Sequence, residues 1–134
     1  MKVNFLNFSD PKDHQYFLIT GGELILKQDA IDSLLDHLKN NGFNEKVTIH
    51  QDELDRMQEI VSRNMGGSLF QENLILHIRH SSGKFPEKIK SLLEDENIFK
   101  SSNIALIVES SIEKIPASGT WVKNFDEYGL IINC

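Results

Sequence analysis

The sequence predicts an α/β fold of three layers, in which a mainly parallel five-stranded sheet lies between two layers of helices. Short apolar runs, typical of strands buried on both faces, alternate about five times with stretches of helical apolar spacing. Parallel neighbours need crossover connections, and right-handed crossovers pack the helices onto the sheet. The length of 134 residues, with 40% hydrophobic and 25% charged residues, fits one globular domain spanning residues 1–134.

The first half of the chain supplies two strands and two helices. The apolar run Tyr16–Thr20 stops at a pair of glycines and predicts the first strand. Apolar residues at helical spacing predict a helix over 23–41, and Glu45–His50 is the second strand. Asp52 is a suitable N-cap for a second helix that ends before Gly66. The apolar face of this second helix consists of Leu54, Met57, Ile60 and Val61.

The second half repeats the alternation. Residues 74–78 form an apolar third strand, and a third helix begins near Pro86, since proline suits the first turn of a helix. Residues 104–108 are the clearest buried strand, and a loop or short helix around Gly119 precedes the last strand at 130–132. In sheets of this kind ligands bind at the carboxyl ends of the strands. We therefore expect chemistry in the loops that follow Thr20, His50, Arg79 and Glu109.

The loop after the first strand only partly fits the phosphate-binding pattern G-x-x-x-x-G-K-[ST]. Gly21 and Lys27 fall in register, but Leu26 replaces the second glycine and Gln28 replaces the hydroxyl residue that binds magnesium. The third strand region, 73–79, also lacks the acidic residue that would hold the metal. We therefore expect no nucleotide cofactor, and we interpret Lys27 as a solvated helix residue.

Other chemistries lack their residues as well. A phosphoacceptor domain needs an aspartate after the third strand, where Arg79 and His80 stand, and Ser68 is not in a G-x-S-x-G elbow. His77 and His80 are three positions apart, a spacing that points them to opposite faces of a strand, and nothing near them in sequence completes a metal site. Cys134 has no basic neighbour in sequence that would favour a thiolate. The sequence thus predicts no catalytic residue and no metal.

Charge and cysteine content narrow the class of partner. Lys and Arg number 14 and Asp and Glu number 20, so the net charge is 14 − 20 = −6, without a basic cluster for DNA or an anionic membrane. There is one cysteine, no signal peptide and no stretch that would span a bilayer, so we expect a cytoplasmic protein. Because the chain stops at Cys134, directly after an apolar run, we expect a piece of a longer protein.

An apolar pair stands out between the second helix and the third strand. Leu69 and Phe70 are adjacent and lie among glycine and polar residues. The pair could pack under the edge of the sheet as local core. Alternatively it is an exposed hot spot that fills an apolar pocket of a partner.

At these residues the chain resembles the N-terminal domain of the delta subunit of bacterial DNA polymerase III, a part of the clamp loader. The resemblance covers nearly everything from Tyr16 to Cys134. The residues that carry it are the first strand through Gly21, Ser68-Leu69-Phe70 before the strand at 74–78, the run at 105–108, and the closing residues 130–134.

The resemblance implies an AAA+-like fold that has lost its phosphate loop, in a non-catalytic subunit of a DNA-directed DNA polymerase, a nucleotidyltransferase. It also implies that Leu69 and Phe70 enter a hydrophobic pocket on the β sliding clamp, that Ser68 and Gly67 shape the approach, and that binding opens the ring during DNA replication. Other loader subunits would bind through regions absent from this chain, and DNA only through the assembled loader. The isolated domain would be monomeric.

Two other hypotheses remain open at this stage. One is a small nucleotide-binding or ATPase domain derived from a P-loop protein, which micromolar binding of ATP with magnesium would support. The other is a regulatory or scaffold domain with an unrelated partner, which burial of Leu69 and Phe70 would favour.

Overall fold

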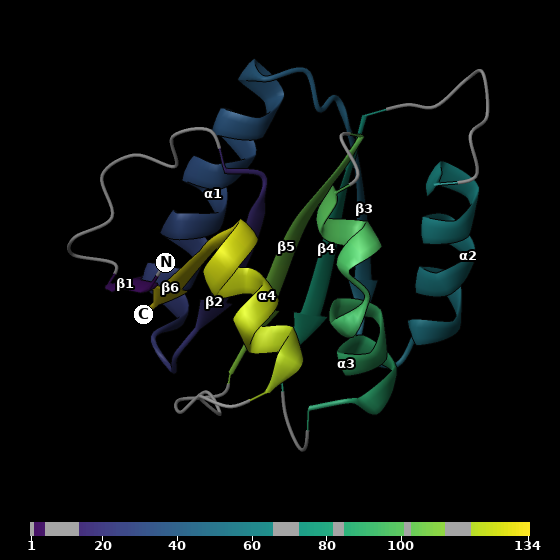
Figure 1. Ribbon diagram of the computed structural model, residues 1–134. Helices are drawn as coiled ribbons and strands as arrows, with labels where there is room; N and C mark the ends of the chain where they lie inside the picture. The colour runs from purple at the N-terminus through teal and green to yellow at the C-terminus, as the bar shows by residue number, and fades with distance from the viewer. Residues whose placement is uncertain (1, 5–13, 66–72, 82–84, 101–102, 112–118) are drawn as a thin grey trace.

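The computed structural model describes residues 2–4, 14–65, 73–81, 85–100, 103–111 and 119–134 (Figure 1). Its strands are β1 (Lys2–Asn4), β2 (Tyr16–Thr20), β3 (Glu45–His50), β4 (Leu74–His80), β5 (Ile104–Ser110) and β6 (Leu130–Asn133). Its helices are α1 (Leu24–Asn40), α2 (Leu54–Met65), α3 (Glu87–Glu94), the 3₁₀ helix η2 (Glu96–Lys100) and α4 (Thr120–Tyr128). The strands form one sheet in the order β1-β6-β2-β5-β4-β3, and every neighbouring pair is parallel.

The path of the chain places β2 in the interior of the sheet. From β2 the chain crosses through α1 to β3 at the far edge of the sheet, and then returns through β4 and β5 to the side of β2. It finally crosses to β6 on the other side of β2. The crossover from β2 to β3 runs toward one edge of the sheet, and the later crossovers run back toward the other. Right-handed crossovers that run in opposite directions place their helices on opposite faces. Accordingly, α1 lies on one face while α2, α3 and α4 lie on the other (Figure 1).

Each face of the sheet has its own core. The α1 face packs Leu34 and Leu38 against Phe17 and Ile107, while the opposite face packs Phe125 and its neighbours from α2, α3 and α4 against the sheet. Successive residues of β5 alternate between the two cores, as the pleat of a strand requires. The three-layer α/β fold expected from the sequence is therefore confirmed.

The structure differs from the sequence prediction in three respects. A sixth strand, β1, pairs with β6 at the edge, and its three residues carry too little pattern for prediction. The stretch expected to be a loop or short helix contains the helix α4, and η2 was not expected. Strands β4 and β5 run two residues beyond 74–78 and 104–108, so Arg79 and Glu109 lie within strands rather than before loops. Within the described residues, no helix is long and apolar enough to cross a membrane.

Candidate functional site

A pocket of about 560 Å³ lies at the carboxyl ends of the strands, on the edge where the sequence predicts chemistry. The first turn of α1 forms one wall, and the ends of β3, β4 and β5 form the others. The lining residues are Leu24, Lys27, His50, Gln51, Asp52, Glu53, Arg79, His80, Ser81, Glu109 and Ser111.

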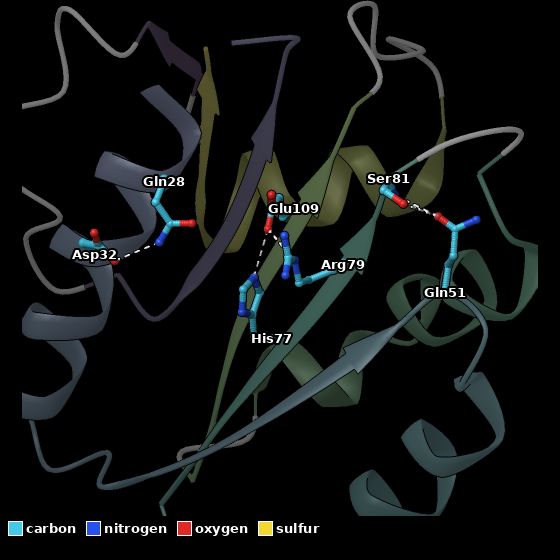
Figure 2. A network of polar contacts seen from close by, with 7 residues as sticks. All are labelled: Gln28, Asp32, Gln51, His77, Arg79, Ser81 and Glu109. Carbon is cyan, nitrogen blue, oxygen red and sulfur yellow. Dashed lines mark hydrogen bonds and ion pairs between the residues drawn. The ribbon is translucent and has the colours of Figure 1, made fainter. Parts of the chain in front are cut away.

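Glu109 is the centre of the polar network in this pocket (Figure 2). Its Oε1 accepts a hydrogen bond from Nε2 of His77 at 3.3 Å and another from Nε of Arg79 at 3.2 Å. Arg79 and Glu109 are opposite each other in the register of β4 and β5, so the two strands bring them together. A carboxylate only accepts, so His77 carries its hydrogen on Nε2, and Nδ1 stays buried without a partner.

The surroundings of Glu109 favour its ionised form. Only 7% of the residue is exposed. The hydrogen bond from His77 lowers the pKa of the carboxyl, burial opposes this, and the charges of Arg79 and Lys27 lower the pKa further. The net direction is below the ordinary value, so Glu109 is a fixed negative charge at the floor of the pocket.

Lys27 corrects the sequence interpretation, because it is not a solvated helix residue. Only 3% of it is exposed, although it lies in the first turn of α1. The first turn packs over the carboxyl end of the sheet, so the side chain lines the pocket. The only sequence feature that pointed to a role for Lys27 in the pocket was its alignment with the lysine of the phosphate-binding pattern.

Gly21 serves the packing of two strands. The backbone N–H of Cys134 donates to the carbonyl oxygen of Thr20 at 2.7 Å, which draws the end of β6 against β2. A Cβ on Gly21 would lie 2.4 Å from the carbonyl carbon of Cys134, and the φ of Gly21 is +111°. This supports the interpretation of the glycine pair as a strand-to-helix turn.

Burial raises the pKa of the Cys134 thiol and Lys27 lowers it to a smaller extent, so the thiol is not activated.

The two histidines that the sequence analysis considered as metal ligands do not lie together. His77 faces α1, whereas His80 lies on the other face, where its Nδ1 hydrogen-bonds Oγ of Ser110 at 2.9 Å and its ring packs edge-on against Phe85. The prediction that these histidines point to opposite faces is confirmed. The described part of the chain contains no group of three metal-ligating side chains. Gln28, at the position of a magnesium-binding hydroxyl, donates to Asp32 on the exposed surface of α1 at 3.0 Å (Figure 2).

One contact closes the rim of the pocket between β3 and β4. The side-chain oxygen of Gln51 accepts a hydrogen bond from the backbone N–H of Ser81 at 2.8 Å (Figure 2). It adds a contact just beyond the last paired residues of the two strands, His50 and Arg79.

The predicted clamp-binding residues Leu69 and Phe70, with Ser68 and Gly67, lie outside the described residues. The stretch that carries them connects the end of α2 to the start of β4. It therefore joins the sheet at the amino end of β4, the end opposite to the pocket.

The comparisons with known proteins agree with this fold. The family model described as DNA polymerase III, delta subunit, matches residues 17–134. Among solved structures the chain is similar to PCH-2 of C. elegans, an AAA+ protein, with 14% sequence identity and a TM-score of 0.58. The match covers 91% of this chain and 34% of the PCH-2 chain, so this chain spans about a third of that protein. No curated protein sequence matches. The AAA+-like fold implied by the sequence resemblance is thus confirmed.

Proposed function

Because the chain belongs to the family of DNA polymerase III delta subunits, which are clamp-loader components, we propose that it binds the β sliding clamp through Leu69 and Phe70. In this proposal the two side chains fill an apolar pocket on the ring, and Gly67 and Ser68 shape the approach of the pair. The domain itself catalyses no reaction and helps to open the ring for loading onto DNA.

The family match is the observation that carries the proposal. The matched residues include the apolar pair, and the pair stands in the sequence between α2 and β4. Leu69 and Phe70 interrupt a glycine-rich and polar connection, a position where large apolar side chains need a partner to cover them.

The pair can supply useful affinity by itself. Burying one large apolar side chain in a well-fitting pocket contributes roughly 2 kcal/mol. Two such side chains would change a dissociation constant by about 100- to 1000-fold. The net charge of −6 does not oppose this contact, because an apolar plug requires no basic surface.

Opening of the ring requires more than binding. A ligand shifts an equilibrium only by the difference between its affinities for the two states, so the domain must bind the opened ring more tightly than the closed one. Other loader subunits would dock on regions beyond this chain, and DNA would be reached through the assembled loader. We propose that the isolated domain is monomeric.

Calorimetric titration of the chain with its cognate clamp tests the proposal. Leu69→Ala combined with Phe70→Ala should weaken binding by about 100-fold or more. The matched control is Leu24→Ala combined with Ile25→Ala, because these residues are also adjacent and apolar and are 71% and 77% exposed on α1. Equal affinity of the wild-type chain and the Leu69/Phe70 variant would overturn the assignment, and so would an equal loss in both double variants.

A further inference from the structure

We propose that a cavity at the amino ends of the strands binds a primary amide group, such as the end of a glutamine side chain. The cavity has a volume of about 260 Å³. It lies between the last turn of α1 and the residues that precede β2 and β4. Its described lining residues are all different from those of the pocket at the carboxyl ends, and none of them is an Asp, Glu, Lys or Arg.

The end of α1 forms a fixed wall of this cavity. Gly42 has a φ of +93°, and its backbone N–H donates to the carbonyl oxygen of Lys39 at 3.2 Å. The backbone N–H of Phe43 donates to the carbonyl oxygen of Leu38 at 3.0 Å. These two bonds are the Schellman motif, which ends a helix in a defined geometry. The motif places the buried side chains of Leu38 and Phe43 as the apolar part of the wall.

The hydrogen-bond donors of the cavity are largely used by the chain itself. Nε2 of His37 donates to the carbonyl oxygen of His14 at 3.3 Å, so Nδ1 of the same ring is an acceptor. Nδ2 of Asn41 donates to this Nδ1 at 3.3 Å and to the carbonyl oxygen of His37 at 2.9 Å. Nε2 of Gln15 also donates to two acceptors, both at 3.0 Å.

Two side-chain acceptors of the cavity remain available. Nδ2 of Asn73 donates to the carbonyl oxygen of Gly42 at 3.3 Å, which leaves Oδ1 as the other polar atom of that amide. From the residues that the structure describes, Oδ1 of Asn41 and Oδ1 of Asn73 receive no hydrogen bond. The nitrogen of a primary amide has two hydrogens to offer to such oxygens. The methylene groups of a glutamine side chain would lie against Leu38 and Phe43.

Other classes of ligand fit this cavity less well. A carboxylate or a phosphate accepts hydrogen bonds and would need donors, most of which are already used. A cation would find no carboxylate in the described lining, and Lys39 already provides a positive charge in the last turn of α1. The volume of about 260 Å³ is below the roughly 300–1,000 Å³ of pockets that hold whole small molecules, so a group the size of a side chain fits best.

The experiment is an NMR titration of the ¹⁵N-labelled chain with three probes of similar size. Propionamide is the analogue of the glutamine side chain, propionate has the same shape without an N–H, and propylammonium is a cation. We expect saturable shifts of the side-chain amide signals of Asn41 and Asn73 with propionamide, and weaker or no binding of the other two probes. Asn41→Ala and Asn73→Ala should each weaken propionamide binding by about three- to tenfold, because each removes one acceptor.

The matched control is Asn40→Ala, because Asn40 is an exposed asparagine of the same helix end that does not line the cavity. It should bind propionamide like the wild-type chain, and urea denaturation of each variant verifies that it folds. Absence of saturable shifts up to about 0.1 M propionamide would overturn the proposal. Equal or tighter binding of propionate or propylammonium would also overturn it. Unchanged affinity in both Asn41→Ala and Asn73→Ala would remove the assigned acceptors and would overturn it as well.

A second assay identifies the source of the amide, and this step rests on the proposed binding of the clamp. If a side chain of the clamp supplies the amide, Asn41→Ala should weaken clamp binding about three- to tenfold relative to Asn40→Ala. If the source is a free small amide, the two variants should bind the clamp equally. Both results support the site and differ only in the source. The propionamide titration contains no clamp, so its outcome is independent of the assignment of Leu69 and Phe70.

Discussion

The two ends of the sheet differ in chemistry. The carboxyl end has a pocket of about 560 Å³ that is lined by charged side chains of both signs, namely Lys27, Asp52, Glu53, Arg79 and Glu109. The amino end has a smaller cavity of about 260 Å³, and among the residues that the structure describes no Asp, Glu, Lys or Arg lines it. Its lining residues are His14, Gln15, His37, Leu38, Asn41, Phe43 and Asn73.

This difference separates two kinds of recognition. A pocket lined by several charged side chains suits a polar ligand, whereas a cavity lined by uncharged and apolar side chains suits contact with a neutral group. The strand β4 connects the two ends, and its seven residues span roughly 20 Å at about 3.3 Å per residue. No single small ligand touches both ends, so each can be changed without removing the contacts of the other.

The largest effect should appear when clamp affinity is compared between variants of the two ends. The Leu69/Phe70 double variant should lose about 100-fold or more, whereas Lys27→Gln combined with Arg79→Gln should stay within about twofold of the wild-type chain. Surface plasmon resonance on immobilised clamp measures both. A comparable loss from the pocket variant would mean that the carboxyl end also contacts the clamp or controls its binding.

The second effect is on stability at the carboxyl end. Glu109→Ala removes the acceptor of His77 and Arg79, and it leaves the buried Nε2–H of His77 without a partner. We expect a loss of about 1–3 kcal/mol in the free energy of unfolding, measured by urea denaturation. Asp36→Ala, at an exposed position of α1, should change stability by less than about 0.5 kcal/mol. If both substitutions have the same small effect, the network around Glu109 does not stabilise the strand ends.

The sequence predicted the fold well because the buried strands are long apolar runs. Residues such as those at 104–108 are buried on both faces, so the pattern identifies them without knowledge of their neighbours. The helix α1 was equally clear, because Ile31, Leu34 and Leu38 repeat at helical spacing. The edge strand β1 was missed because three residues establish no period.

The candidate site was harder to predict because it depends on contacts between distant residues. Arg79 and Glu109 are 30 positions apart, and only the register of β4 against β5 makes them a pair. Lys27 has the polarity of a solvated helix residue, and its burial follows from how the first turn of α1 lies over the sheet. The rule that ligands bind at carboxyl ends of strands gave the place of the pocket but not its charges.

A third prediction concerns pH at the carboxyl end. The pKa of Glu109 in the folded chain is below its ordinary value of 4.5, so the ionised carboxylate stabilises the folded state above that value. This stabilisation is lost as the pH falls through the folded pKa. The difference in unfolding free energy between the wild-type chain and Glu109→Gln should therefore be largest near neutral pH and shrink toward pH 3. A difference that is constant over this range would show that the charge of Glu109 does not contribute.

The smallest effect should come from the amino end. Nδ2 of Asn73 donates to the carbonyl oxygen of Gly42 at 3.3 Å, a long bond at an exposed position where water can replace the amide. Asn73→Ala should thus cost about 0.5 kcal/mol or less by urea denaturation. A cost equal to that of Glu109→Ala would mean that the amino end is held as firmly as the carboxyl end. The contrast between the two ends would then be one of charge alone.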